Sequence, residues 1–258
     1  MECKVSIITV VYNGEKYLCD TIESVINQTY KNIEYIVIDG GSTDKTLSIL
    51  KKYSGNINKI ISETDEGIYD AMNKGIKLAK GDIVGIINSD DYFDINAVSN
   101  IVDRFKKCDC DVVYGDKLLY DEKNKIKKLY TVDVPQSIGE VNISMVHPST
   151  FVKNEVYEKI NFDCKYEICA DRDLFYKIYG HGYRFCKIDQ VVAIMRTGGV
   201  SSSLIKPLYE GFVIRKKYLG YWLAICFAIK MPLGHLKEKI TRYLIARNLI
   251  KSTSWFKI

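Results

Sequence analysis

The sequence predicts an α/β protein with a mixed, mostly parallel sheet flanked by helices, followed by a helical C-terminal extension. The first 105 residues contain four short apolar runs rich in valine and isoleucine, each followed by apolar residues at helical spacing. An uninterrupted apolar run is typical of a strand that is buried on both faces. Strands that alternate with helices predict a parallel sheet with right-handed crossovers. Each run also ends in polar residues, as expected where ligands bind at the carboxyl ends of such strands.

The strands and helices of this first half follow in strict alternation. The strands are expected at residues 5–12, 33–39, 57–62 and 82–88. The helices are expected at residues 15–29, 43–53, 67–80 and 97–105. In the first helix, Leu18, Ile22, Val25 and Ile26 form one apolar stripe. The polar clusters after the strands lie at residues 12–14, 39–42, 64–67 and 88–91. We expect all four clusters along one rim of the sheet.

The pattern changes after residue 111. Extended segments are expected at residues 111–120, 126–132, 145–153 and 183–196, and a helix at residues 171–179. This half is expected to complete the same sheet. From residue 204 onward the helical pattern dominates, so we expect a domain over residues 1–203, with halves at 1–110 and 111–203, and a helical tail over residues 204–258.

Composition limits the class of protein. The chain has 258 residues, 47% hydrophobic and 27% charged, which excludes a disordered or fibrous protein. Its eight cysteines form no C-x-x-C pair, and with three histidines they give no zinc pattern. Scattered thiols indicate a reducing cytosol. No apolar stretch reaches the roughly 18 residues of a membrane span, and we expect no signal peptide. These features predict a cytoplasmic protein.

The net charge of +5 is unevenly distributed. Residues 201–258 contain eleven lysines and arginines against two acids, Glu210 and Glu238. A basic tail suits an anionic surface such as a membrane, phosphates or nucleic acid. A solvated helical face would have the same composition.

The segment Asn88-Ser89-Asp90-Asp91 ends the fourth expected strand. Two adjacent carboxylates repel each other unless a cation neutralises them. Oxygen ligands suit Mg²⁺ or Mn²⁺, and such an ion could bridge the phosphates of a nucleotide diphosphate. Alternatively, one of these aspartates caps the next helix.

Asp39 ends the second expected strand and precedes two glycines, Gly40 and Gly41, which allow a ligand to approach the backbone. Its carboxylate could accept hydrogen bonds from a base or a ribose. The following residues, 42–44, could instead only cap a helix. No Gly-Lys-Ser/Thr follows, so this is not a Walker loop.

Asp171 opens the helix expected in the second half. The dipole keeps a carboxylate at a helix N-terminus ionised, and it could take a proton from an attacking hydroxyl. A capping role is the alternative. His147, before a proline, could contact a phosphate or a sugar hydroxyl or be purely structural, and the loop with Arg196 and Ser201 could close over a diphosphate or be a linker.

Taken together, these segments resemble the large inverting family 2 glycosyltransferases, which have the GT-A fold. The similarity rests on four segments: residues 5–13, residues 28–30 with 36–44, residues 65–75 with 79–82, and residues 88–91. It covers roughly residues 3–203, and the most similar subgroup makes bacterial exopolysaccharide, including colanic-acid-type enzymes. The chain departs from the family pattern at Asn88, where Asp is frequent, and at Ala170, where Glu is frequent.

The resemblance implies inverting transfer from a nucleotide-sugar donor, with a UDP-sugar favoured, to a glycan or lipid-linked acceptor. It implies a nucleotide-sugar-binding half over residues 1–110 and an acceptor-binding half over residues 111–203. Asp171 would be the general base, and Asp90 with Asp91 would hold Mn²⁺ or Mg²⁺. His147, Arg196 and Ser201 would contact the acceptor or the diphosphate. The donor-binding residues implied are Thr9, Tyr12, Asn13, Asp39, Asp65, Asn88, Ser89 and Asp90.

Three questions stay open at this level. A nucleotidyltransferase of sugar phosphates is the runner-up, although residues 12–16 match its glycine-rich signature loop poorly. A non-catalytic module that binds a nucleotide sugar or glycan is the third reading. The tail, with an apolar segment at residues 218–233 between basic residues, suits the inner face of the plasma membrane but also a packed helix or a homodimer contact. We expect no nucleic-acid partner.

Overall fold

The protein is described by a computed structural model that covers residues 2–131, 145–198, 205–246 and 255–257. Four parallel strands form the first half of its sheet, in the order β3-β2-β1-β4. They are β1 (Val5–Val11), β2 (Ile33–Asp39), β3 (Lys59–Ser62) and β4 (Ile83–Asn88). Every residue of β1 is buried, and Ile7 and Ile8 point into separate apolar clusters on opposite faces. The predicted parallel sheet is confirmed.

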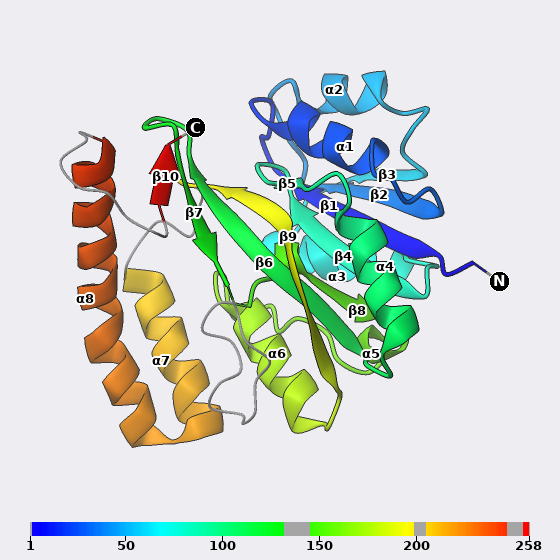
Figure 1. Cartoon of the computed structure of the whole chain (residues 1–258). Coiled ribbons are helices and arrows are strands. Elements are labelled where there is room, and N and C mark those ends of the chain that lie inside the picture. The colour runs from blue at the N-terminus through cyan, green and yellow to red at the C-terminus, as the bar shows by residue number, and fades with distance from the viewer. Residues whose placement is uncertain (1, 132–144, 199–204, 247–254, 258) are drawn as a thin grey trace.

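The second half extends the sheet with antiparallel and parallel neighbours. Its strands are β5 (Tyr92–Phe93), β6 (Val112–Asp121), β7 (Ile126–Tyr130), β8 (Thr150–Lys153), β9 (Phe185–Arg196) and β10 (Trp255–Lys257). β8 pairs antiparallel with β4 and with β6, and β9 runs parallel to β6 and reaches β5. The sheet therefore curls at β6, bringing the end of β9 beside the turn that follows β4 (Figure 1).

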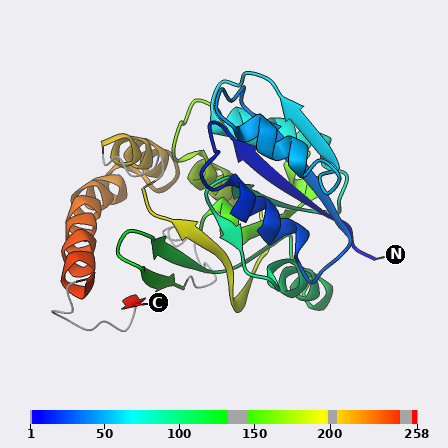
Figure 2. The same ribbon diagram turned by 90° about the horizontal axis from the view of Figure 1, so that it is seen from above.

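Helices cover both faces of the sheet, as Figures 1 and 2 show. On one face lie α1 (Leu18–Ile26), α2 (Thr46–Lys52) and α4 (Ala97–Lys107). On the other lie α3 (Ile68–Leu78), α5 (Asn154–Tyr157) and α6 (Ala170–Gly180). The predicted α/β class with helices on both sides is thus confirmed. A single turn of 3₁₀-helix, His147–Ser149, occupies part of the segment that was expected to be extended.

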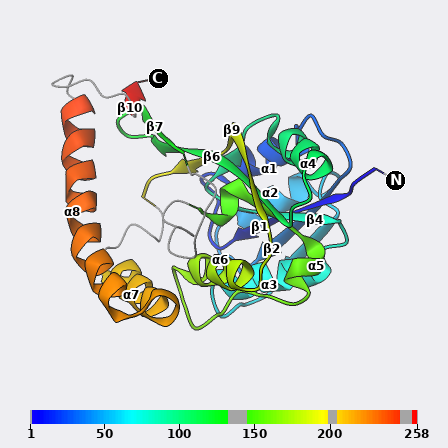
Figure 3. The same cartoon turned by 60° about the horizontal axis from the view of Figure 1, so that its bottom comes forward.

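The C-terminal extension consists of α7 (Ile205–Leu219) and α8 (Tyr221–Ala246). Ile214 of α7 is fully buried in the same apolar cluster as Leu174 of α6, and Tyr218 stacks on Tyr176 with ring centroids 4.9 Å apart. α8 packs mainly on α7 and stands at the edge of the molecule (Figure 3). The expected tail is therefore not one element: α7 shares the core of the preceding domain, whereas α8 contacts the β6–β7 hairpin through Glu238 and Ile245. No described helix is long and apolar enough to cross a membrane.

Candidate active site

The carboxyl ends of β1 and β2 meet because the strand register pairs Val11 with Asp39. Asp39 is fully buried, and its Oδ2 accepts hydrogen bonds from the Ser42 backbone N–H (3.2 Å) and the Ser62 hydroxyl (2.7 Å). Asp39 therefore lies at the predicted rim, just below its surface, where it fixes the loop that begins at Gly40.

The loop after β1 is locked to the loop after β2. Asn13 adopts a left-handed conformation (φ 50°), which asparagine tolerates better than most residues. Its backbone N–H donates to the Ser42 hydroxyl (2.7 Å), and its Oδ1 accepts from the Thr43 N–H (2.9 Å). Tyr12, next to it, is 65% exposed. A free aromatic ring on a rigid rim is suited to stacking on a nucleotide base.

Asp65 occupies the space that Gly40 leaves open. A Cβ on Gly40 would lie 2.4 Å from Asp65 Oδ2, and Asp65 Oδ1 accepts a hydrogen bond from the Gly67 N–H (2.9 Å). A side chain at position 40 would therefore displace the Asp65 carboxylate from its present place beside the loop of Asp39. The structure brings these predicted donor-binding residues together at one rim.

Thr9 is the predicted donor-binding residue that the structure places elsewhere. It pairs with Val37 on one side and Ile87 on the other, two positions before β1 ends. Its side chain is fully buried, and its hydroxyl lies 3.0 Å from the Tyr35 hydroxyl. Thr9 is thus a satisfied core residue in this structure, because its strand continues past it before reaching the rim.

Asp90 and Asp91 form a turn directly after β4. Burial raises the pKa of Asp90, and burial followed by the neighbouring Asp90 charge raises the pKa of Asp91. The Thr21 hydroxyl donates to the backbone carbonyls of Ser89 (2.9 Å) and Asp91 (2.6 Å), which fixes the turn. Among the described residues no other side chain donates to the Asp90 carboxylate, so it is available to a ligand.

Arg196, at the end of β9, clamps this turn. Its backbone N–H donates to Asp91 Oδ1 (3.0 Å), and its guanidinium donates to the Asp90 carbonyl (2.7 Å) and to Asp20 (2.5 Å). The side chain is 8% exposed and lies over the rings of Tyr17 and Tyr92. Arg196 therefore holds the two aspartates in place, which differs from the diphosphate contact expected from the sequence. Ser201 lies outside the described residues.

A chain of side chains connects the two aspartates to Asp171. Asn88 Nδ2 donates to Asp91 Oδ2 (3.2 Å), and His147 Nε2 lies 3.0 Å from Asn88 Oδ1. On the other side of the imidazole ring, His147 Nδ1 lies 3.8 Å from Asp171 Oδ2. Residues from β4, the 3₁₀ turn and the first turn of α6 therefore converge. The convergence of Asp90, Asp91 and Asp171 is the arrangement that the sequence predicted.

Two further residues at this site carry no local signal in the sequence. Glu210 of α7 accepts hydrogen bonds from the backbone N–H groups of residues 167, 168 and 169, at 2.9 to 3.0 Å. It thereby fixes the segment that leads into Asp171. Lys117 of β6 lies within the electrostatic influence of Asp171, Arg172 and Asp91, and burial lowers its pKa to about 8. Only the folded chain brings these residues to the site.

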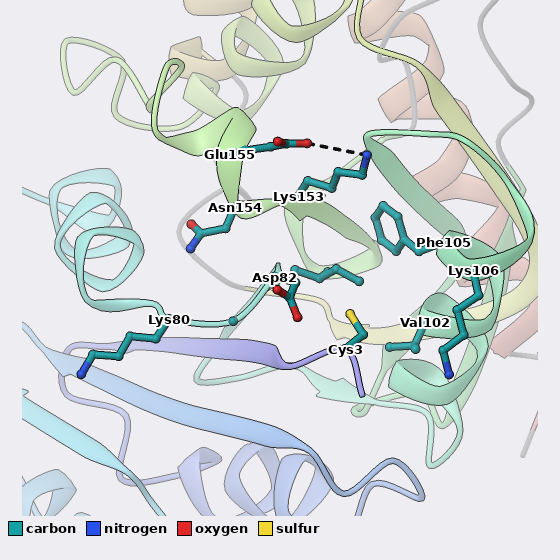
Figure 4. A pocket seen from close by; sticks show the side chains of 11 residues that line it. Cys3, Lys80, Asp82, Val102, Phe105, Lys106, Lys153, Asn154 and Glu155 are labelled. Atoms are coloured by element: carbon teal, nitrogen blue, oxygen red, sulfur yellow. Dashed lines mark ion pairs between the residues drawn. The ribbon is translucent and has the colours of Figure 1, made fainter. Parts of the chain in front are cut away.

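A cavity of about 550 Å³ lies at the opposite end of the sheet, beside Cys3 and residues 80–83 at the amino ends of β1 and β4 (Figure 4). Two of its charged groups have partners: Asp82 accepts from the Lys4 backbone N–H, and Lys153 pairs with Asp111. This cavity is separate from the convergence of aspartates described above.

The model of the family described as Glycosyl transferase family 2 matches residues 6–179. The chain belongs to glycosyltransferase family 2. Among its relatives, this glycosyltransferase is 35% identical over 123 residues to glycosyltransferase GlyG of Streptococcus pneumoniae, covering 46% of this chain and 41% of that protein. It is 33% identical over 186 residues to an uncharacterised glycosyltransferase of Rickettsia typhi, covering 67% and 58%. The chain thus spans about half the length of these two relatives.

A third relative matches from end to end. The chain is 25% identical over 258 residues to a PGL/p-HBAD biosynthesis glycosyltransferase of Mycobacterium tuberculosis, covering 97% of this chain and 96% of that protein. The family match ends within α6, so Arg196 and Glu210 lie beyond it.

Solved structures share the GT-A fold of this glycosyltransferase. A crystal structure of S. aureus TarS 1–349 in complex with UDP-GlcNAc has a TM-score of 0.68 at 22% identity, covering 83% of this chain and 65% of that one. The mannosyltransferase PcManGT from Pyrobaculum calidifontis, in complex with GDP-Man and Mn²⁺, has a TM-score of 0.62 at 17% identity, covering 89% and 65%. At these identities the likeness establishes the fold alone.

Proposed function

We propose that this protein transfers a sugar from a nucleotide diphosphate sugar to an acceptor hydroxyl, with inversion at the anomeric carbon. The observation that carries this proposal is the connection of Asp91 to Asp171 through Asn88 and His147. It supports a single site in which the carboxylate pair would hold a cation that binds the diphosphate, and Asp171 would accept a proton from the alcohol.

Asp90 and Asp91 fit a divalent cation. The pKa values of the half-buried Asp90 and the buried Asp91 stay raised although Arg196 lies beside them, and no ion pair to either carboxylate is formed among the described residues. Hard oxygen ligands of this kind suit Mn²⁺ or Mg²⁺. When bound, such an ion would act as a Lewis acid that stabilises negative charge on the leaving diphosphate. Arg196 and Thr21 keep the two aspartates in position for it.

The reaction is a single displacement. Asp171 accepts the proton of the acceptor hydroxyl while the hydroxyl oxygen forms a bond to the anomeric carbon. The bond from that carbon to the diphosphate oxygen breaks, and its electron pair leaves with the nucleoside diphosphate. Attack opposite the leaving group inverts the anomeric configuration. Glu210 contributes by holding the backbone that leads into Asp171.

A UDP-sugar is the favoured donor. The TarS structure that shares this fold contains UDP-GlcNAc, although PcManGT contains GDP-Man. The test is release of nucleoside diphosphate when the protein is incubated with UDP-GlcNAc, Mn²⁺ and an extract of candidate acceptors. A nucleotidyltransferase would instead form or consume pyrophosphate, and a binding module would release nothing. The anomeric configuration of the product, compared with that of the donor, shows whether the transfer inverts.

Gly40 offers a test of the donor rim. We expect Gly40→Ala to weaken UDP binding about fivefold, because the new Cβ displaces Asp65, and one net hydrogen bond is worth about 1 kcal/mol. Gly55→Ala is the matched control, since its Cβ would meet nothing within 4 Å. Calorimetric titration with UDP measures both. Equal UDP affinities in the two variants would show that Asp65 does not contribute to donor binding.

We also propose that α8 lies on an anionic membrane, at the inner face of the plasma membrane, where a lipid-linked acceptor would be accessible. Its exposed apolar residues recur at intervals of three, four or seven positions, which places them on one helix face: Trp222, Ile229, Leu233, Leu236, Ile240 and Tyr243. Trp222 is 78% exposed and Leu233 64%. Exposed lysines, Lys230, Lys237 and Lys239, flank this stripe.

The charges of α8 favour a membrane over a second copy of the chain. The acid of α8, Glu238, faces Lys128 and Tyr130 of β7 rather than the stripe. Two stripes flanked only by lysines would repel each other, whereas the same lysines attract anionic lipids, each by about 1 kcal/mol near the surface. An apolar stripe with basic flanks is typical of an interfacial helix.

Flotation with vesicles that contain phosphatidylglycerol tests this location. We expect wild type to float, and Leu233→Asp with Leu236→Asp to reduce the bound fraction at least about fivefold, since each removes buried apolar area and adds repulsion. Leu47 is an exposed leucine on α2, and the control variant Leu47→Asp should bind vesicles as the wild type does. Failure of the wild type to bind at physiological salt would remove the proposal. A dimer that the stripe variants dissociate would assign the stripe to a second copy.

A further inference from the structure

Two arginines beside the proposed base lack an anionic partner. Arg172 follows Asp171 directly, and Arg215 lies on α7 with 4% of its surface exposed. Within the described residues neither guanidinium forms an ion pair with a carboxylate. Arg172 Nη1 and Arg215 Nη2 are buried atoms without a hydrogen-bond partner. The one hydrogen bond described for the Arg215 side chain is a 3.4 Å contact to the Gly211 carbonyl of its own helix.

Both guanidinium groups reach the same space next to Gly211. An ideal Cβ on Gly211 would lie 2.7 Å from Arg172 Nη1 and 3.4 Å from Arg215 Nη1. Phe227 of α8 closes this space from the other side, with the Arg215 guanidinium carbon 3.5 Å and that of Arg172 5.7 Å from its ring centroid. The absence of a side chain at Gly211 thus allows both guanidinium groups to approach the same point on α7.

This arrangement is unfavourable without an anion. Burying a charge costs free energy unless it is paired, and a second like charge adds repulsion. Burial, and then the charge of Arg172, lowers the pKa of Arg215 to about 10. The carboxylate of Glu210 is already engaged by three backbone N–H groups, so it does not neutralise the pair.

We propose that Arg172 and Arg215 bind a phosphate group of the acceptor, so that the acceptor is a phosphate- or diphosphate-bearing alcohol. This rests on the proposed function. Guanidinium groups match phosphate oxygens with paired, charge-assisted hydrogen bonds. The donor diphosphate is proposed to bind through the cation that Asp90 and Asp91 would hold, whereas Arg172 lies at the base, where its backbone N–H donates to Asp171 Oδ1 (2.8 Å). A phosphate held here would present a nearby hydroxyl to the base.

The test uses the full chain saturated with UDP and Mg²⁺, with octyl phosphate as the probe in calorimetric titration and octyl glucoside as the uncharged comparison. We expect octyl phosphate to bind wild type, and Arg172→Gln and Arg215→Gln each to weaken it at least about tenfold. Arg184→Gln is the matched control, because Arg184 is an exposed arginine paired with Asp109 at the far end of β9. UDP affinity is measured in every variant, so that a loss of donor binding can be distinguished from a loss of octyl phosphate binding.

Four outcomes decide the proposal. Unchanged octyl phosphate affinity in Arg172→Gln and Arg215→Gln would overturn it. Competition between octyl phosphate and UDP would assign the arginines to the donor and also overturn it. Loss of vesicle flotation in these variants, with octyl phosphate binding intact, would assign them to a membrane headgroup. A tenfold loss of octyl phosphate affinity with UDP affinity retained supports the proposal. If Arg215→Gln fails to fold, the result for Arg172→Gln decides, because Arg172 is partly exposed. Arg215→Lys then serves as the conservative variant at position 215.

Discussion

Replacing Asp171 by asparagine is expected to reduce the rate of sugar transfer about 10²- to 10⁴-fold while leaving the affinity for UDP unchanged. Asparagine has the shape of aspartate but cannot accept the hydroxyl proton. Asp171 lies in the first turn of α6, and its side chain is 16% exposed, so it can reach an incoming alcohol. The rate is measured as UDP release at saturating donor and acceptor, and the affinity by calorimetric titration.

Asp163→Asn is the control for this variant, because Asp163 is paired with Lys165 on the loop that precedes α6. It should retain both rate and affinity. Near-normal transfer by Asp171→Asn would exclude Asp171 as the base. A loss of UDP affinity in Asp171→Asn would show instead that this carboxylate serves the donor.

The parallel half of the fold could be predicted because its signals are local. β1, β2 and β4 are continuous apolar runs, and each was expected within a residue or two of its observed bounds. The rim followed from topology: once the strands are parallel, their carboxyl ends share an edge. The clusters that contain Asp39, Asp65, Asp90 and Asp91 could therefore be predicted to lie along one rim of the sheet. Thr9 is buried two positions before β1 ends, because the strand length, and not its composition, decides which residue reaches the rim.

The contacts that position these carboxylates could not be predicted, because each joins distant parts of the chain. Arg196 reaches the Asp90 carbonyl across 106 positions, and Glu210 reaches the Cys169 N–H across 41. In the sequence, Arg196 is an arginine that precedes a polar loop, and Glu210 is an acidic residue in a basic helix, so no local pattern distinguishes either of them. The roles follow only from which strand ends beside which turn, and from which face of α7 packs on α6.

The two departures from the family pattern, Asn88 and Ala170, lie in different environments. An amide at position 88 donates to Asp91 and accepts from His147 at once, which a carboxylate at that position could not do. At position 170 the side chain is fully buried, and a carboxylate from another element, Glu210, binds the backbone just before it. The site thus obtains its acidic support from α7, beyond the residues that the family model matches.

Asp90→Asn is expected to abolish metal-dependent transfer, with a loss of about a thousandfold or more, since Lewis-acid stabilisation is worth several kcal/mol and each 1.36 kcal/mol is a factor of ten. The same variant should be at least as stable as wild type without metal, because it removes one of two adjacent like charges whose pKa values are raised. EDTA should reduce the wild type to the level of the variant. Melting temperature with and without Mn²⁺ is measured beside the rate.

The paired outcome distinguishes a metal ligand from a structural residue. If Asp90 only supports the turn, its replacement lowers the melting temperature and the rate together, and Mn²⁺ still raises the melting temperature. If Asp90 binds the ion, the Mn²⁺-dependent rise disappears while the metal-free protein stays folded. Asp103→Asn, an exposed acid on α4, should keep both the rise and the rate. Among the described residues, no side chain donates to the Asp90 carboxylate, whereas Asp91 accepts from the Arg196 backbone and from Asn88. The effect of removing the metal ligand is therefore expected to be separable from an effect on stability at Asp90.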